Sequence, residues 1–343
     1  MSFVAALLPV AIYIFVVYKL DSFSLVSVKS LLMLVLLGMA SALVCFGVFL
    51  LTGHVLSDGV SELANPVVEE VVKAIPLYVM ARRKKMVFFI DSVIFGAAVG
   101  GGFSILENAF YLLMGEPLGI GTVLFRGLEV ALVHMGCSAT IAVVLMMFVR
   151  FNEHARAGMP VKGSNLIVFL FFFAVILHVV HNSFHADPFG QFICVLGALS
   201  LLLFFVYQYD SEMIHRWVDQ GLDQQVSLLR SIKEGQLGET PTGKFLMSVK
   251  ENFPAEVFFD VICYVQLFVE LSVAAKSRFM LREAGMDMPL EDSIKELYRS
   301  QYAEFKFMEK SLGKSVRMTV APIVMCSPAD RKSLDDLLRE SEK

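Results

Sequence analysis

Long runs of apolar residues recur through the first two-thirds of the chain. A helix needs about 20 apolar residues to cross a bilayer, and seven runs approach or exceed that length. They cover residues 3–20, 30–53, 64–80, 87–114, 127–149, 165–184 and 190–207. Polar residues become frequent after Gln208. The pattern predicts an all-α protein: a polytopic membrane helical bundle of about seven transmembrane helices (residues 1–207), followed by a helical cytosolic module (residues 208–343).

One run within the predicted tail has two interpretations. The stretch "AEVFFDVICYVQLFVELSVAA", residues 255–275, is long enough to span a bilayer, but Asp260, Gln266 and Glu270 interrupt it. We interpret it as a buried helix of the cytosolic module. An eighth span is the alternative, and the tail's partner is not indicated by any motif.

Composition agrees with a membrane protein. Apolar residues make up 56% of the chain and charged residues 18%, whereas soluble domains have about 45–50% and 25%. The net charge of −4 gives no indication of a nucleic-acid partner. The five cysteines are scattered, which favours neither a disulfide framework nor a zinc ribbon.

Basic residues in the predicted loops indicate the orientation, because loops rich in Lys and Arg stay cytoplasmic. Alternate loops contain Lys19 and Lys29, then "RRKK" at 82–85, then three more basic residues between 150 and 162. The intervening loops contain one, Arg126. We therefore expect the N-terminus outside and the tail in the cytoplasm. The first run has no preceding basic residue, which is typical of an anchor rather than a cleavable signal peptide.

The third run carries charges that oppose membrane insertion. In "NPVVEEVVKAIPLYVM", the residues Glu69, Glu70 and Lys73 cost roughly 7 to 10 kcal/mol to insert, and its seven Val, Ile and Leu residues return roughly 2 to 4 kcal/mol. Polar partners on other helices must therefore offset these charges. Glu69 and Lys73 are four residues apart, so we expect them to share a helix face and to pair.

Three further runs also contain ionisable residues, and all four sets lie at similar depth. From the cytoplasmic ends, Glu70 lies about 18 Å deep, Glu107 and His134 about 24 Å, and His178 about 20 Å, at 1.5 Å per residue. Ionisable groups inside membranes are rare and usually functional. The shared depth predicts one convergent polar site.

Peptide hydrolysis would use these groups in recognisable roles. It needs an activated water, a stabilised oxyanion and a proton donor for the leaving amine. Two histidines and a glutamate can hold Zn²⁺ with one position open for water, and Glu107, His134 and His178 match that set. Glu69 or Glu70 would then be the general base and Asn182 a donor to the oxyanion. A metal-free mechanism based on the paired glutamates is the alternative.

The ordered motifs resemble those of the PrsW-type intramembrane proteases, within the superfamily of CAAX prenyl endoproteases and bacteriocin-processing proteins. They are "EEVVK" (69–73), "FSILEN" (103–108), His134 and "HVVHN" (178–182). Glu107 stands where the CAAX enzymes have histidine, and Lys73 where they have arginine, which agrees with the PrsW branch. The resemblance implies an intramembrane protease of a bacterial cytoplasmic membrane, a membrane-protein substrate such as an anti-sigma factor, and Glu69 as the residue that activates water.

Two other function classes fit a cluster of buried Glu and His residues. A proton- or ion-coupled transporter also uses such residues at mid-membrane, although transporters often contain internal repeats and this sequence contains none that we detect. A silent scaffold is the third class. The presence of every group that the proteolytic chemistry needs favours the protease.

Overall fold

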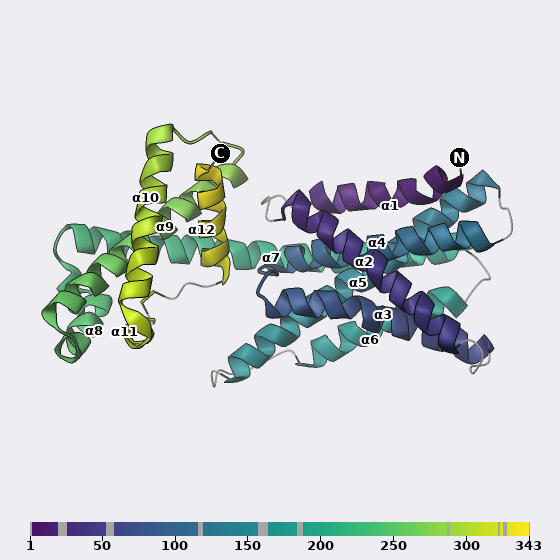
Figure 1. The fold of residues 1–343 in the computed structure, drawn as a ribbon, viewed down its shortest axis with the longest axis horizontal. Helices are drawn as coiled ribbons and strands as arrows, with labels where there is room; N and C mark the ends of the chain where they lie inside the picture. The colour runs from purple at the N-terminus through teal and green to yellow at the C-terminus, as the bar shows by residue number, and fades with distance from the viewer. Residues whose placement is uncertain are drawn as a thin grey trace. The chain divides into compact units, whose positions relative to one another are not determined.

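The computed structural model is helical throughout (Figure 1). It describes residues 2–19, 26–52, 58–115, 119–156, 164–183, 188–286, 288–321, 323–324 and 328–342. About 91% of it is helix, and no strand occurs among these residues. The chain divides into two compact units, Met1–Asp210 and Ser211–Lys343. The fold is therefore the all-α polytopic bundle that the sequence predicted.

The first unit contains seven helices, whose positions follow the seven apolar runs. They are α1 (Ser2–Lys19), α2 (Val28–Thr52), α3 (Asp58–Arg82), α4 (Phe89–Met114), α5 (Ile120–Arg156), α6 (Ser164–Ser183) and α7 (Pro188–Lys233). Helices α5 and α7 extend well beyond their apolar runs, and α7 continues into the second unit. Lys162 and the loop at 185–187, which entered the orientation argument, lie outside the described residues.

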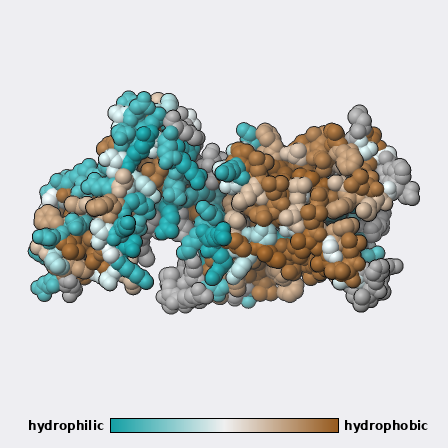
Figure 2. Space-filling model, viewed as in Figure 1, coloured by the Kyte–Doolittle hydropathy of each residue, from teal (hydrophilic) through white to brown (hydrophobic). Residues whose placement is uncertain are grey.

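The surface of the first unit is strongly apolar. Figure 2 shows an almost continuous hydrophobic face on this unit and a mostly hydrophilic face on the second. Large apolar side chains on several helices are more than half exposed, among them Phe15, Leu36, Leu43, Phe172 and Phe205. Because a monomeric soluble protein rarely exposes apolar patches of this extent, the surface agrees with an integral membrane protein.

Helix α4 lies at the centre of the unit, against α1, α2 and α5. Small residues on α4 make this packing close. A Cβ atom on Gly100 would lie 2.2 Å from the carbonyl oxygen of His134, and one on Gly96 would lie 2.3 Å from that of Ser138. Only glycine permits such approach of two helix backbones. The glycines thereby bring the second half of α4 next to His134 on α5.

Helix α3 is less apolar than the other helices of the first unit. Seven described helices are long and apolar enough to cross a membrane: α1, α2, α4, α5, α6, α7 and α9. Helix α3 is not among them, because Glu62, Glu69, Glu70, Lys73 and Arg82 lower its hydropathy. It nevertheless packs against α2, α5 and α6. Its insertion therefore depends on those neighbours, as the energy balance of its sequence indicated.

The second unit has its own apolar core. It contains the end of α7, α8 (Pro241–Val249), α9 (Ala255–Glu283), α10 (Asp292–Ser311), α11 (Gly313–Val320), α12 (Pro328–Ser341) and two short 3₁₀ turns, Leu237–Glu239 and Lys250–Asn252. Helix α9 supplies the centre of this core, where Val265 and Phe268 pack with Phe305 and Leu334. Helix α9 corresponds to the ambiguous apolar run, and many of its apolar side chains are buried within the tail, whereas Phe259 is exposed.

The N-terminus of α4 is capped by a residue distant in sequence. The backbone amides of Phe89 and Ile90 donate to the carboxylate of Asp210 on α7, at 2.9 and 2.5 Å. Asp91 accepts from the amides of Val87 and Phe88. The first amides of a helix lack partners within it, so these two carboxylates satisfy the start of the helix that carries Glu107.

Candidate active site

Helix α3 contributes three polar side chains to the interior of the first unit. Glu70 and Lys73 are almost completely buried, with 1% and 0% exposure, and Glu69 is buried too. Lys73 Nζ donates to Glu70 Oε1 at 2.5 Å. The prediction that Lys73 would pair with Glu69 is therefore wrong. Positions three residues apart also share a helix face. Glu70 has a second partner, which holds its carboxylate on the same face as Lys73.

That second partner is His178 on α6. Its Nδ1 atom lies 2.7 Å from Glu70 Oε1, and its Nε2 atom lies 3.5 Å from Glu69 Oε2. Since a carboxylate accepts hydrogen bonds, Nδ1 donates to Glu70, and Nε2 is the nitrogen turned toward Glu69. This Nε2 is a buried nitrogen without a hydrogen-bond partner. Glu70 thus orients His178 so that its free nitrogen faces Glu69.

His134 on α5 connects α3 to α4. Its Nδ1 atom lies 3.0 Å from Lys73 Nζ, and its Nε2 atom lies 2.5 Å from Glu107 Oε2. Its ring packs against those of Phe103 and His178, at centroid distances of 4.9 and 4.8 Å. The imidazole is therefore held on both nitrogens and on its faces, inside a bundle where it is 3% exposed.

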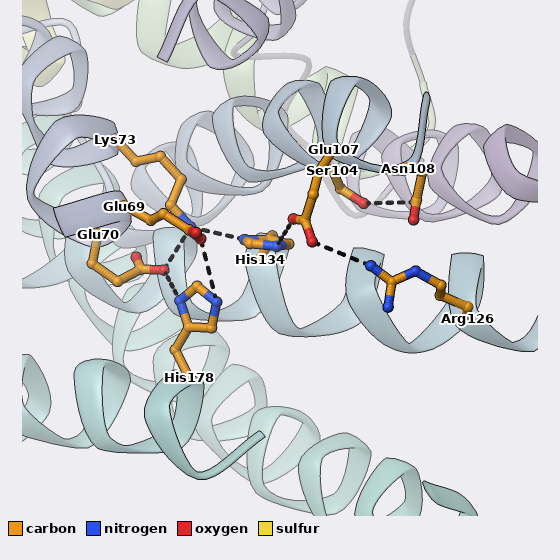
Figure 3. A network of polar contacts seen from close by, with 9 residues as sticks. All are labelled: Glu69, Glu70, Lys73, Ser104, Glu107, Asn108, Arg126, His134 and His178. Atoms are coloured by element: carbon orange, nitrogen blue, oxygen red, sulfur yellow. Dashed lines mark hydrogen bonds and ion pairs between the residues drawn. The ribbon is translucent and has the colours of Figure 1, made fainter. Parts of the chain in front are cut away.

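Glu107 forms the more exposed edge of the cluster. Arg126 on α5 lies 3.5 Å from its carboxylate and stacks over the ring of Tyr111 at 3.7 Å. The Glu107 and Arg126 side chains are about one-third exposed, at 34% and 32%. The contacts thus form one chain through four helices, drawn in Figure 3, in the order Arg126, Glu107, His134, Lys73, Glu70, His178 and Glu69.

Five of the six residues predicted for the site belong to this chain of contacts: Glu69, Glu70, Glu107, His134 and His178. Asn182, the sixth, lies one turn after His178 on α6, and none of the described contacts ties it to the chain. The sequence did not assign Lys73 to the site, because its expected partner was a neighbour on its own helix. Arg126 could be picked out from the sequence, because it is the single basic residue in the loops predicted to lie outside.

Three of these side chains could together bind a metal ion. Glu69, His134 and His178 each offer one ligand atom, and these atoms lie within 4.8 Å of one another. The free Nε2 of His178 and its contact with Glu70 match the usual arrangement, in which a metal-binding histidine donates its other N–H to a carboxylate. Two histidines and one carboxylate also match catalytic zinc sites. The residues therefore fit a metal, with Glu69 in the place predicted for Glu107.

The comparison with protein families agrees with this site. A family model described as PrsW family intramembrane metalloprotease matches residues 26–208, more than half of the chain. The chain belongs to the PrsW family. No curated protein and no solved structure matches it.

The matched region contains every residue of the contact chain and helices α2 to α6 in full. As a PrsW-family protein, the chain is an intramembrane protease, and it acts on membrane proteins within the bilayer. Family membership thus favours the protease over the transporter that the sequence left open. The second unit lies outside the match.

Proposed function

We propose that this chain is an intramembrane endopeptidase in which Glu69 activates the water that attacks the peptide bond. The observation that carries the proposal is the difference between Glu69 and the other two carboxylates. Glu70 is bound to both Lys73 and His178, and Glu107 lies against His134 and Arg126. Glu69 has one contact in the network, at 3.5 Å. Its carboxylate is the one most available to accept a proton.

The reaction needs few steps from these residues. Glu69 accepts a proton from water as the water oxygen attacks the carbonyl carbon, and it later delivers that proton to the leaving nitrogen, the usual alternation of a general base and acid. The oxyanion that forms is stabilised by donors placed around it. We assign this role to Asn182, four residues after His178 and on the same side of α6. Glu70 and Glu107 act as positioning residues for His178 and His134.

A metal ion, when bound, would be held by one atom each of Glu69, His134 and His178, and would polarise the carbonyl oxygen and acidify a bound water. The second carboxylate oxygen of Glu69 would then be the one that accepts the proton. The choice of Zn²⁺ rests on the donor types, since imidazole and carboxylate suit this ion. The metal-free route uses the same Glu69 and the same oriented histidines.

Orientation and substrate are also proposals. The distribution of Lys and Arg supports an external N-terminus and a cytoplasmic tail, and the resemblance to the PrsW-type proteases implies a bacterial cytoplasmic membrane. The end of the apolar runs supports the division into a protease domain, residues 1–207, and a cytosolic tail, residues 208–343. The substrate would be a membrane-spanning regulator such as an anti-sigma factor, as the resemblance to the PrsW-type proteases implies.

The experiment is a cleavage assay with purified protein in liposomes that contain a set of defined transmembrane peptides. Products are identified by mass spectrometry, with and without a chelator. We expect cuts within the apolar segment for the wild type and none for His178→Ala. His181→Ala is the matched control, since His181 lies on the same helix but contacts Gln191 and Glu129 instead. Equal cleavage by wild type and His178→Ala would remove this site from the reaction.

A further inference from the structure

The ammonium group of Lys73 is hydrogen-bonded to a nitrogen of His134 that a metal ion would need as a ligand. Lys73 Nζ lies 3.0 Å from His134 Nδ1 and 2.5 Å from Glu70 Oε1. An ammonium group can donate three hydrogen bonds and accept none. The Nδ1 lone pair of His134 must therefore point at Lys73, and it is engaged in that hydrogen bond.

The other nitrogen of His134 is engaged as well. Nε2 lies 2.5 Å from Glu107 Oε2, a close contact without the angles of a regular hydrogen bond. Two acceptors at that distance would repel each other, so Nε2 carries the proton. His134 is therefore a neutral imidazole with its proton on Nε2 and its lone pair turned toward Lys73. Its contact with Glu107 is the carboxylate contact expected of a metal-binding histidine. The nitrogen that would remain for a metal ion, Nδ1, faces Lys73 instead.

We propose that Lys73 competes with a divalent cation for His134 and thereby sets the metal affinity of the site. Two cations cannot share one lone pair, and their repulsion is strong in a buried site of low dielectric constant. Lys73 also neutralises part of the negative charge of the cluster through its ion pair with Glu70. Metal entry then requires the Lys73 side chain to leave His134. This inference rests on the proposed ligand set and goes beyond it.

Removing the lysine charge should tighten metal binding. Lys73→Met keeps a long unbranched side chain without the cation, and we expect it to bind Zn²⁺ at least about tenfold more tightly than the wild type, because the repulsion is removed. Lys73→Arg keeps the charge and should not tighten binding. Affinity is measured by equilibrium dialysis of the full-length protein in detergent, with Co²⁺ absorption as a second, spectroscopic readout of the ligand set.

The tail offers a matched control. Lys276 is also fully buried, at 2% exposure, and pairs with Asp330 at 3.2 Å. Lys276→Met removes a buried lysine charge from the second unit, so it should leave Zn²⁺ affinity unchanged. A change of equal size in both variants would show that the effect is unspecific and would overturn the proposal.

Lys73→Met leaves Glu70 without its 2.5 Å partner, and this variant can fail to fold. Lys73→Gln also removes the charge but keeps an amide donor for Glu70, and it provides the same test. Tighter binding in either folded variant supports the competition. Unchanged affinity, or no metal binding by any variant, overturns it, while the liposome cleavage assay decides separately whether the chain is a protease that uses this site.

Discussion

Lys73 Nζ lies between Glu70 and His134, 2.5 Å from the first and 3.0 Å from the second. This one side chain joins the carboxylate that orients His178 to the imidazole that Glu107 orients. Figure 3 shows that the two halves of the cluster meet at this point. The charges that make α3 unfavourable in a bilayer are therefore the same groups that attach α3 to α5 and α6.

The Glu70–Lys73 pair makes Glu70→Gln a test of stability. Glutamine leaves the Lys73 cation buried without a carboxylate, and breaking a buried pair by removing one partner costs about 3–5 kcal/mol. We expect a clearly lower melting temperature in detergent, followed by circular dichroism. Glu62→Gln, on an exposed position of the same helix, should melt like the wild type. Equal melting of all three proteins would mean that the pair does not hold α3 in place.

Gly100→Ala should damage both stability and cleavage. The new Cβ would lie 2.2 Å from the backbone oxygen of His134, so α4 and α5 must separate, and overpacking of this kind costs about 1–3 kcal/mol. The separation also moves Glu107 away from His134. Gly121→Ala on α5 is the control, since nothing lies within 4 Å of its Cβ. If both variants melt and cleave alike, close backbone packing does not position the site.

The orientation can be tested with paired reporters. A fluorescent protein that folds only in the cytoplasm should be bright when fused after Ser211 and dark when fused after Gly119. Alkaline phosphatase, which is active only outside, should give the reverse. The opposite pattern at both positions would invert the topology and would contradict the positive-inside interpretation of the loops.

Much of the membrane fold could be predicted from the sequence, because apolar length alone marks most spans. Six of the seven predicted runs correspond to helices long and apolar enough to cross a membrane. The exception is α3, whose charged residues lower its hydropathy. Helix α9 enters the set instead, although it packs as the core of the tail. Length and hydropathy alone do not show how these two helices are packed, because packing depends on what covers their side chains.

The site was predictable in membership but less so in its pairings. Depth along each helix placed Glu70, Glu107, His134 and His178 in one layer, and the structure brings them into contact. Which carboxylate faces which nitrogen depends on helix rotation and on rotamers, and i,i+4 spacing alone assigned Lys73 to the wrong glutamate. The cap of α4 by Asp210 is a similar case, since 120 residues separate the two and no local pattern connects them.

The most direct test of the account is the cleavage rate of Glu69→Gln. Glutamine matches glutamate in shape but cannot accept the proton from water, so we expect a loss of about 10²–10⁴-fold, the contribution of a general base, in a protein that remains folded. Glu62→Gln should cleave like the wild type. If folded Glu69→Gln retains the wild-type rate on transmembrane peptides in liposomes, Glu69 does not activate the water and the proposed mechanism is wrong.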